Sequence, residues 1–165
     1  MTRDQKIVAT GAASGIVSMI ALVWVLIQLL PSPGGNAIPY ALSWLAFAAL
    51  PLFLTLAAIG NARFTSEAID PTLGKESPRM VVDARVADNT LQQFVLFAAG
   101  SLALAVNLPP GQLDLIGAVS IVFVVMRLAF WIGYRIRPIY RAFGFAGTAY
   151  LNLGLLAASL WLSVT

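Results

Sequence analysis

The chain has 165 residues, of which 59% are hydrophobic and 10% are charged, and its mean hydropathy is +0.86. This composition excludes a soluble domain and predicts an integral membrane protein, and the uninterrupted apolar runs favour helices over a barrel. The chain has no cysteine and no histidine, which excludes thiol nucleophiles and the commonest zinc ligands, so we expect no metal site. The net charge of +3 follows from membrane topology and predicts no nucleic-acid partner.

The first apolar run extends from Ile7 to Leu30 and is followed by a segment rich in proline and glycine. It is longer than the core of a signal peptide and has no clear cleavage site, so we expect a retained transmembrane helix. Gly11 and Gly15 lie on one face of this helix and would allow another helix to approach closely. The spacing is a weak signal, because it is frequent in apolar helices.

Four further helices are expected. The second apolar run extends from Ile38 to Gly60, and Pro51 predicts a kink within it. A polar loop follows, from Asn61 to about Met80. The remaining helices are expected at residues 85–106, 112–135 and 142–162, the first of them stopping near Pro109-Pro110-Gly111. We therefore predict an all-α membrane bundle of five transmembrane helices, divided into a leading helix with its loop (1–37) and a four-helix domain (38–165).

The basic residues predict the orientation of these helices. All ten fall in or near three segments: the N-terminus (Arg3, Lys6), the long loop and its exit (Arg63, Lys75, Arg79, Arg85), and the connection between the last two helices (Arg127, Arg135, Arg137, Arg141). The other connections and the C-terminus have none. By the positive-inside rule, the N-terminus is cytoplasmic. The expected location is a bacterial inner membrane, with the C-terminus periplasmic.

A polar patch opens the predicted third helix. At about 100° per residue, Arg85, Asn89 and Gln92 lie on one face of that helix. Polar groups in or near hydrocarbon are costly unless partnered, and they tend to mark functional sites. The patch is therefore either part of a pocket for a charged small molecule or an interfacial helix start whose arginine extends into the lipid headgroups.

The fourth helix has a second polar face. Arg127, Phe130, Trp131 and Tyr134 share this face, and Arg127 lies about 12 Å of helix before Arg135. A guanidinium at that depth must face the bundle interior, a partner or water. Arginines beside amides and a phenol suit a small ligand with several carboxylates, and they would also lower the pKa of a bound thiol. The alternative is that the arginines at positions 135, 137 and 141 only contact anionic lipid.

These motifs resemble a known family. The pattern Arg85-x-x-x-Asn89-x-x-Gln92 is similar to the Arg-x-x-x-Asn-x-x-Glu signature of the membrane-associated proteins in eicosanoid and glutathione metabolism, the MAPEG family. Arg127 and Tyr134, followed by the segment 137–141, are similar to the family's later Arg…Tyr…Arg segment. The resemblance extends from about Ile38 to the C-terminus, so the chain looks like a bacterial-type member with an extra N-terminal helix.

The resemblance implies a homotrimer that binds glutathione as a cosubstrate between subunits, with a lipophilic small-molecule substrate entering from the membrane lipids. It implies a glutathione-dependent transferase or peroxidase acting on lipophilic electrophiles. The implied glutathione-binding residues are Arg85, Asn89, Gln92, Arg127, Tyr134 and Arg137. Arg137 and Arg141 both match the family's later arginine, and Arg141, with Tyr134, is the preferred catalytic pair that would hold the thiolate.

The chain departs from the family at Gln92, where the signature has glutamate. Glutamine accepts a hydrogen bond from a guanidinium but does not neutralise it, and Asp88 is the nearest carboxylate that could compensate. The alternative to an enzyme is therefore a non-catalytic membrane bundle, either a scaffold or a binder of another anionic ligand. A transporter is less favoured, because neither inverted repeats nor a chain of titratable groups across the bilayer is visible.

Overall fold

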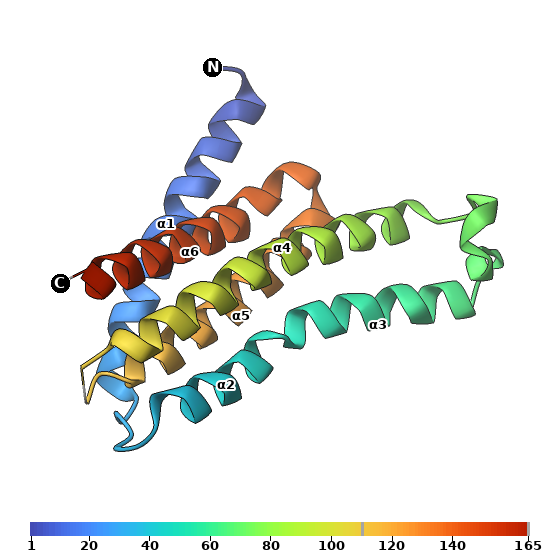
Figure 1. The fold of residues 1–165 in the computed structure, drawn as a ribbon. Coiled ribbons are helices and arrows are strands. Elements are labelled where there is room, and N and C mark those ends of the chain that lie inside the picture. Colours follow the sequence, from blue (N-terminus) through green and yellow to red (C-terminus); the bar gives the residue numbers. More distant parts are fainter. Residues whose placement is uncertain (110, 165) are drawn as a thin grey trace.

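The fold is a bundle of long helices. A computed structural model describes residues 1–109 and 111–164, so Pro110 and Thr165, at the predicted helix stop and domain end, lie outside it. Within the described residues every regular element is helical, and five spans are long and apolar enough to cross a membrane. These spans are α1 (Arg3–Leu29), α2 with α3 (Ala37–Ala48, Leu50–Phe64), α4 (Pro78–Asn107), α5 (Asp114–Ile136), and η3 with α6 (Pro138–Arg141, Ala142–Val164) (Figure 1). The predicted all-α membrane fold with five transmembrane helices is confirmed.

Two helices begin earlier than the apolar runs predict, because polar residues cap them. The side chain of Thr2 accepts a hydrogen bond from the backbone N–H of Gln5, and the side-chain oxygen of Gln5 accepts one from the backbone N–H of Thr2. This capping box starts α1 at Arg3. At the start of α4 the side chain of Ser77 accepts a hydrogen bond from the backbone N–H of Met80, and Pro78 lies in the first turn. The polar patch therefore lies two turns inside α4. The loop before it contains only the short helices η1 (Glu67–Ile69) and η2 (Pro71–Leu73).

The second membrane span is broken where the sequence predicts a kink. Helix α2 ends at Ala48 and α3 begins at Leu50, with Pro51 at its first turn. Proline has no amide hydrogen for the carbonyl four residues earlier, so it interrupts the helical hydrogen bonds here. Figure 1 shows the resulting bend between the two helices.

The hydrophobic core lies between α2, α4, α5 and α6. At its centre the rings of Phe97 from α4 and Phe123 from α5 stack with their centroids 4.4 Å apart. Both residues are fully buried, together with Ile116 and Val122 of α5. Helix α5 has the largest buried share of the five spans, because the other helices surround it. Because α5 is surrounded, its polar side chains must find their hydrogen-bond partners inside the bundle.

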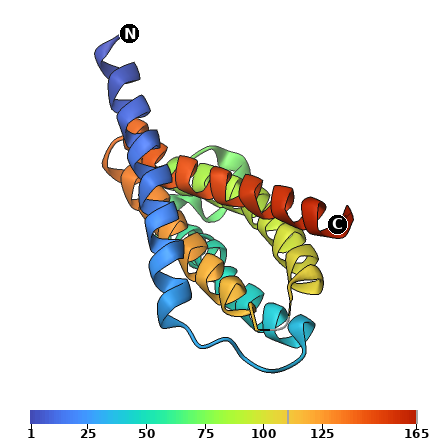
Figure 2. The same ribbon diagram turned by 90° about the vertical axis from the view of Figure 1, so that its left-hand side faces the viewer.

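Glycine allows α1 and α5 to pack closely against α6. A Cβ atom at Gly15 of α1 would overlap the backbone of Phe143, and one at Gly144 of α6 would overlap the backbone of Met126 and Phe130. Helix α1 makes its most extensive contacts with α6, and the two cross in Figures 1 and 2. Close packing at Gly11 and Gly15 is thus observed where the spacing indicated it.

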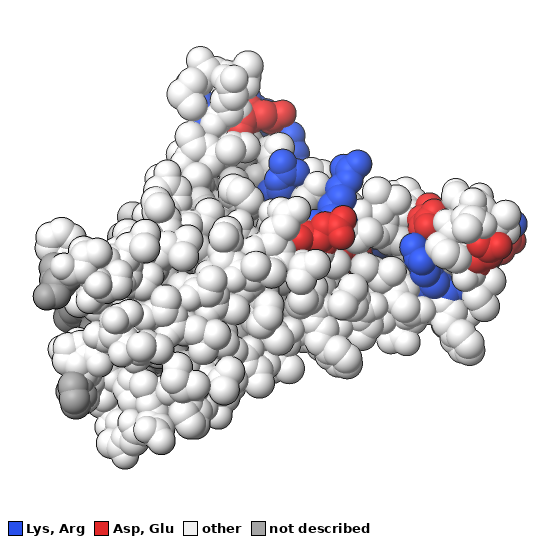
Figure 3. Space-filling view, in the orientation of Figure 1, with Lys and Arg blue, Asp and Glu red and all other residues white. Residues whose placement is uncertain are grey.

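Most charged residues lie toward one end of the bundle. On the face seen in Figure 3 they lie around the N-terminus, at the α3–α4 loop and between these two places, and the end at the left shows none. We call the end where α3 leads to α4 and α5 leads to α6 the arginine-rich end. The other end, where α1 leads to α2 and α4 leads to α5, is the arginine-poor end. Neither connection at the arginine-poor end contains a lysine or arginine.

Candidate functional site

Arg127 lies in the interior of the bundle, held by three helices. It is 1% exposed and is the largest fully buried side chain among the described residues. Its Nη2 atom donates to Oδ1 of Asn89 on α4 (3.1 Å), and its Nη1 atom donates a longer bond to Oγ1 of Thr148 on α6 (3.5 Å). The close approach of α6 to α5 at Gly144 brings Thr148 to this position. The guanidinium also lies 4.0 Å from the centroid of the Phe130 ring.

No carboxylate neutralises Arg127 in the part of the chain that the structure describes. Its two oxygen partners are a neutral amide and a hydroxyl, and its Nε atom has no hydrogen-bond partner among the described residues. A buried guanidinium is stabilised in a low-dielectric interior only when it is paired and fully hydrogen-bonded. The site therefore keeps a positive charge that is only partly compensated.

A second arginine of α5 has a complete set of partners. Arg135 donates from Nε to Oδ1 of Asp83 (2.8 Å) and from Nη2 to Oδ2 (2.6 Å), a bidentate pair. Asp83 is 2% exposed and also accepts from the indole nitrogen of Trp131 (2.7 Å). The guanidinium of Arg135 lies 4.3 Å from the centroid of the Trp131 ring. Together, Asp83, Trp131 and Arg135 tie the first turns of α4 to the end of α5.

Tyr134 and Arg141 are in contact at the arginine-rich end. The guanidinium of Arg141 lies 4.9 Å from the centroid of the Tyr134 ring. Gly133 allows this contact, because η3 folds back onto α5 so closely that a Cβ there would lie 2.8 Å from the carbonyl oxygen of Tyr140. Tyr134 is buried and meets the edge of the Phe130 ring, with centroids 5.7 Å apart. One series of contacts thus runs from Asn89 through Arg127, Phe130 and Tyr134 to Arg141.

The other predicted site residues lie outside this series. Arg85 and Gln92 are exposed on α4, as is Asp88, and none of the three forms a hydrogen bond or ion pair with another described residue. Asn89 alone turns from this polar face toward Arg127. Arg137 is exposed and pairs instead with Asp4 at the start of α1 (3.2 Å).

Several polar residues of the interior were not predicted from the sequence. Gln93 is buried where Gln92 is exposed, and both its backbone carbonyl and its side-chain oxygen accept from the amide of Asn152 on α6 (3.0 and 2.8 Å). Asp83 is an acid in the first turns of a membrane helix, a signal that could have identified it. Thr148 offers no such signal, because threonine is common on apolar helices.

Two hollows adjoin these residues at the arginine-rich end. One, of about 330 Å³, lies beside Arg141 and is also lined by Val8, Ile139 and Phe145. The other, of about 450 Å³, is lined by Arg79 and Arg135. No cluster of metal-ligating side chains was found among the described residues.

Comparisons with known proteins agree with the sequence motifs. Residues 41–161 match the model of the MAPEG family, a segment that leaves out α1. Over 122 residues the chain is 26% identical to transmembrane protein 79 of Mus musculus. The aligned segment covers 74% of this chain but only 30% of the length of that protein. No solved structure matches the chain. Since the family match covers most of the sequence and all four of the later spans, the chain belongs to the MAPEG family.

Proposed function

We propose that this chain binds glutathione at its arginine-rich end and conjugates it to lipophilic electrophiles dissolved in the membrane. The observation that carries the proposal is the series of contacts from Asn89 through Arg127 and Tyr134 to Arg141 in a member of the MAPEG family. The family as a whole is associated with glutathione. The series places two cationic groups and a phenol at one end of the bundle.

The chemistry of glutathione suits the residues available. The tripeptide has two carboxylates, for which guanidinium groups are the preferred partners. In our proposal the carboxylates bind the exposed Arg85 and Arg141, with Arg137 as a further candidate. Arg127 is too deeply buried in the single chain for direct contact, so its role is to position Asn89 and Phe130 and to keep the site electropositive.

Arg141 and Tyr134 supply the chemistry in this proposal. A guanidinium and a phenol hydroxyl beside a bound thiol stabilise its thiolate and lower its pKa below the ordinary value. With chlorodinitrobenzene as the electrophile, the sulfur forms a bond to the ring carbon, chloride leaves, and the thiol proton passes to solvent. The catalytic residues proposed are therefore Arg141 and Tyr134.

We also propose that the site is completed in a homotrimer. Arg85, Asp88 and Gln92 are exposed on one face of a membrane helix, and polar groups there are costly without partners. A neighbouring copy of the chain would cover this face and let Gln92 contribute to the glutathione site. Native mass spectrometry in mild detergent should show three chains. A stable monomer that still binds glutathione would contradict a shared site.

The distribution of basic residues supports one orientation. We propose that the arginine-rich end faces the cytoplasm of a bacterial cell and that the N-terminus lies on that side of the inner membrane. Reporter fusions after Lys6 and Lys75 should then read as cytoplasmic, and fusions after Gly34 and Gly111 as periplasmic. A periplasmic signal after Lys75 would reverse the assignment.

Calorimetric binding of glutathione to the purified protein tests the main proposal. Arg141→Ala should weaken binding by about 1.5–3 kcal/mol, the range for hydrogen bonds to charged groups. Arg137→Ala removes the neighbouring arginine from the same connection and separates the two candidates. Arg3→Ala, an exposed cation on α1, is the matched control and should bind as wild type does. Absence of glutathione binding at millimolar concentration would exclude the proposal.

One observation favours the alternative, a scaffold or a binder of another anion. The family's signature glutamate is Gln92 here, so the site lacks the carboxylate that the signature supplies. If glutathione fails to bind while the trimer forms normally, this alternative takes its place.

A further inference from the structure

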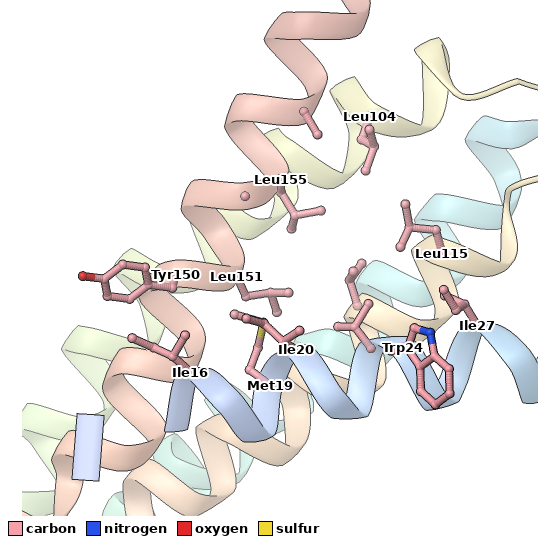
Figure 4. A pocket seen from close by; sticks show the side chains of 14 residues that line it. Ile16, Met19, Ile20, Trp24, Ile27, Leu104, Leu115, Tyr150, Leu151 and Leu155 are labelled. Atoms are coloured by element: carbon pink, nitrogen blue, oxygen red, sulfur yellow. The ribbon is translucent and has the colours of Figure 1, made fainter. Parts of the chain in front are cut away.

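A long apolar groove lies between α1 and α6, toward the arginine-poor end. Its volume is about 550 Å³. Six lining residues come from α1 between Ile16 and Ile27 and five from α6 between Tyr150 and Ala158, and α4 and α5 form its floor (Figure 4). The groove exists because α1 touches α6 closely at Gly15 and then diverges from it, as Figure 2 shows.

This groove is separate from the glutathione site proposed above. That site lies at the arginine-rich end, around Arg141 and Tyr134. The groove is lined partly by the second half of α1, from Ile16 to Ile27. Helix α1 lies outside the segment that matches the family. The groove is therefore a feature of this chain rather than of the family core, and the argument for it does not rest on the proposed function.

The lining is suited to hydrocarbon. Tyr150 has the only polar group among the lining side chains besides the indole of Trp24, and in Figure 4 its hydroxyl points away from the others. The groove faces the apolar layer of a bilayer, where no water is available to fill it. Lipid tails are as apolar as leucine, so hydrocarbon can fill such a space at no desolvation cost.

The dimensions of the groove favour a single chain. From Ile16 to Ile27 the helix rises about 16 Å, close to the ~15 Å depth of one leaflet of a bilayer core. A transmembrane helix ~10 Å in diameter is too wide to lie inside a groove of this volume and length.

The area and charge of this region also argue against a protein partner. The apolar lining of the groove alone is a small fraction of the roughly 800 Å² per partner that a stable interface buries, so the groove by itself is too small to be such an interface. The connections at the arginine-poor end have no lysine or arginine, and Asp114 is the acid nearest to them in the sequence. An anionic headgroup would find no countercharge on these segments, so a zwitterionic one is favoured.

We propose that the groove between α1 and α6 binds one acyl chain of a zwitterionic glycerophospholipid from the leaflet at the arginine-poor end. Helix α1 then holds a lipid against α6 and closes the bundle on that side. Occupancy fills the space that the diverging helices leave.

Gly154 offers a way to block the groove without disturbing the fold. It lines the groove, and a Cβ added there would meet no atom within 4 Å. Gly154→Leu therefore fills the space where the acyl chain would lie. Gly60→Leu is the matched control, because Gly60 is also a helical glycine with nothing within 4 Å of its Cβ direction, on α3 and far from the groove. Thermal unfolding in detergent checks that both variants are folded.

The experiment measures phospholipid bound to the intact protein. Protein released from phosphatidylcholine nanodiscs into mild detergent should retain phosphatidylcholine in native mass spectra. Gly154→Leu should lower the fraction bound by about tenfold at equal lipid concentration, and Gly60→Leu should leave it unchanged. A diazirine-bearing acyl chain should label residues 16–27 and 150–158 in wild type, and much less in Gly154→Leu.

Two results would overturn the proposal. Equal retention of lipid by wild type and Gly154→Leu would show that the groove does not hold the chain. Because the protein has no cysteine, Ile20→Cys introduces a single thiol in the groove lining. Efficient formation of a disulfide-linked dimer by that variant would show that a second copy occupies the groove instead.

Discussion

Arg127 and Arg135 lie on the same helix, eight residues apart, and their surroundings differ in one respect. Arg135, near the end of α5, has both oxygens of Asp83 and an indole ring. Arg127, two turns deeper, has an amide, a hydroxyl and a phenyl ring, and no carboxylate among residues 1–109 and 111–164. The less buried arginine is neutralised and the more buried one is not. Stability alone would favour the opposite arrangement, because charge is most costly where burial is deepest.

The presence of a carboxylate partner at Arg135 and its absence, within the described chain, at Arg127 indicate different roles. Arg135 has a structural role, and Arg127 has a role other than stabilising the fold. The Asp83–Arg135 pair joins α4 to α5, and both carboxylate oxygens of Asp83 accept hydrogen bonds. Arg127 retains positive charge about two turns inside Tyr134 and Arg141, to which Phe130 connects it. A retained charge stabilises an anion nearby, which is what a site for a polycarboxylate or a thiolate requires.

The largest effect is expected from Asp83→Asn, which removes the ion pair between Asp83 and Arg135. Removing the acid leaves Arg135 without its countercharge, and such losses cost about 3–5 kcal/mol when both groups are buried. The side chain of Arg135 is 28% exposed, so we expect the free energy of unfolding to fall by about 2–4 kcal/mol. Denaturant unfolding in detergent micelles measures it. Asp88→Asn, at an exposed acid on the same helix, should change it little.

A smaller and opposite effect is expected from Asn89→Asp, which gives Arg127 the carboxylate that it lacks. The two side chains are 3.1 Å apart, so a charge-assisted hydrogen bond should raise the free energy of unfolding by about 1–2 kcal/mol. The same change should weaken glutathione binding, because it neutralises the site. A variant that is less stable than wild type would show that Arg127 is already compensated in the native protein.

Gln92→Glu is the companion to that change and restores the residue of the family signature. Gln92 is exposed and makes no contact with Arg127 within the chain, so we expect the stability of the monomer to change by less than about 0.5 kcal/mol. If a neighbouring subunit completes the site, the new carboxylate should strengthen glutathione binding or raise conjugation of chlorodinitrobenzene. No change in either quantity would place position 92 outside the site.

The smallest effect concerns a carboxylate held by a hydroxyl instead of a guanidinium. In the loop, hydrogen bonds from the side chain and then the backbone of Thr72 lower the pKa of Asp70 below its ordinary value. A lowered pKa means that this stabilisation is complete above the unfolded pKa of about 3.9 and is lost as the pH falls through the lower folded value. Carboxyl carbon NMR should show the pKa of Asp70 rising in Thr72→Val.

Much of the fold was predictable from the sequence because the physical signals are local. The apolar runs predict the spans, Pro51 predicts the break in the second one, and the glycine spacing predicts close packing of α1 against another helix, which the structure shows to be α6. The helix starts at Arg3 and Pro78 were missed because a cap depends on hydrogen bonds from single polar residues, which hydropathy does not register.

The site was predictable only in part because helical periodicity gives a face but not its direction. Arg127, Asn89 and Tyr134 do come together in the interior. Gln92 shares a polar face with Asn89, yet α4 turns that face so that Asn89 points inward and Gln92 outward, while Gln93 is buried. Which of two adjacent glutamines enters the core depends on the rotation of the helix, and that rotation is fixed by packing against α5 and α6.

The break at Pro51 has a mechanical consequence for the second span. The joint between α2 and α3 already lacks a helical hydrogen bond, since Pro51 has none to donate to the carbonyl of Phe47, so bending there breaks no further one. Helix α2 packs against both α4 and α5, whereas α3 packs mainly against α4 and leads to the charged loop. A force applied to that loop would therefore change the angle of α3 relative to α2 at this joint, and α2 would keep its position against α4 and α5.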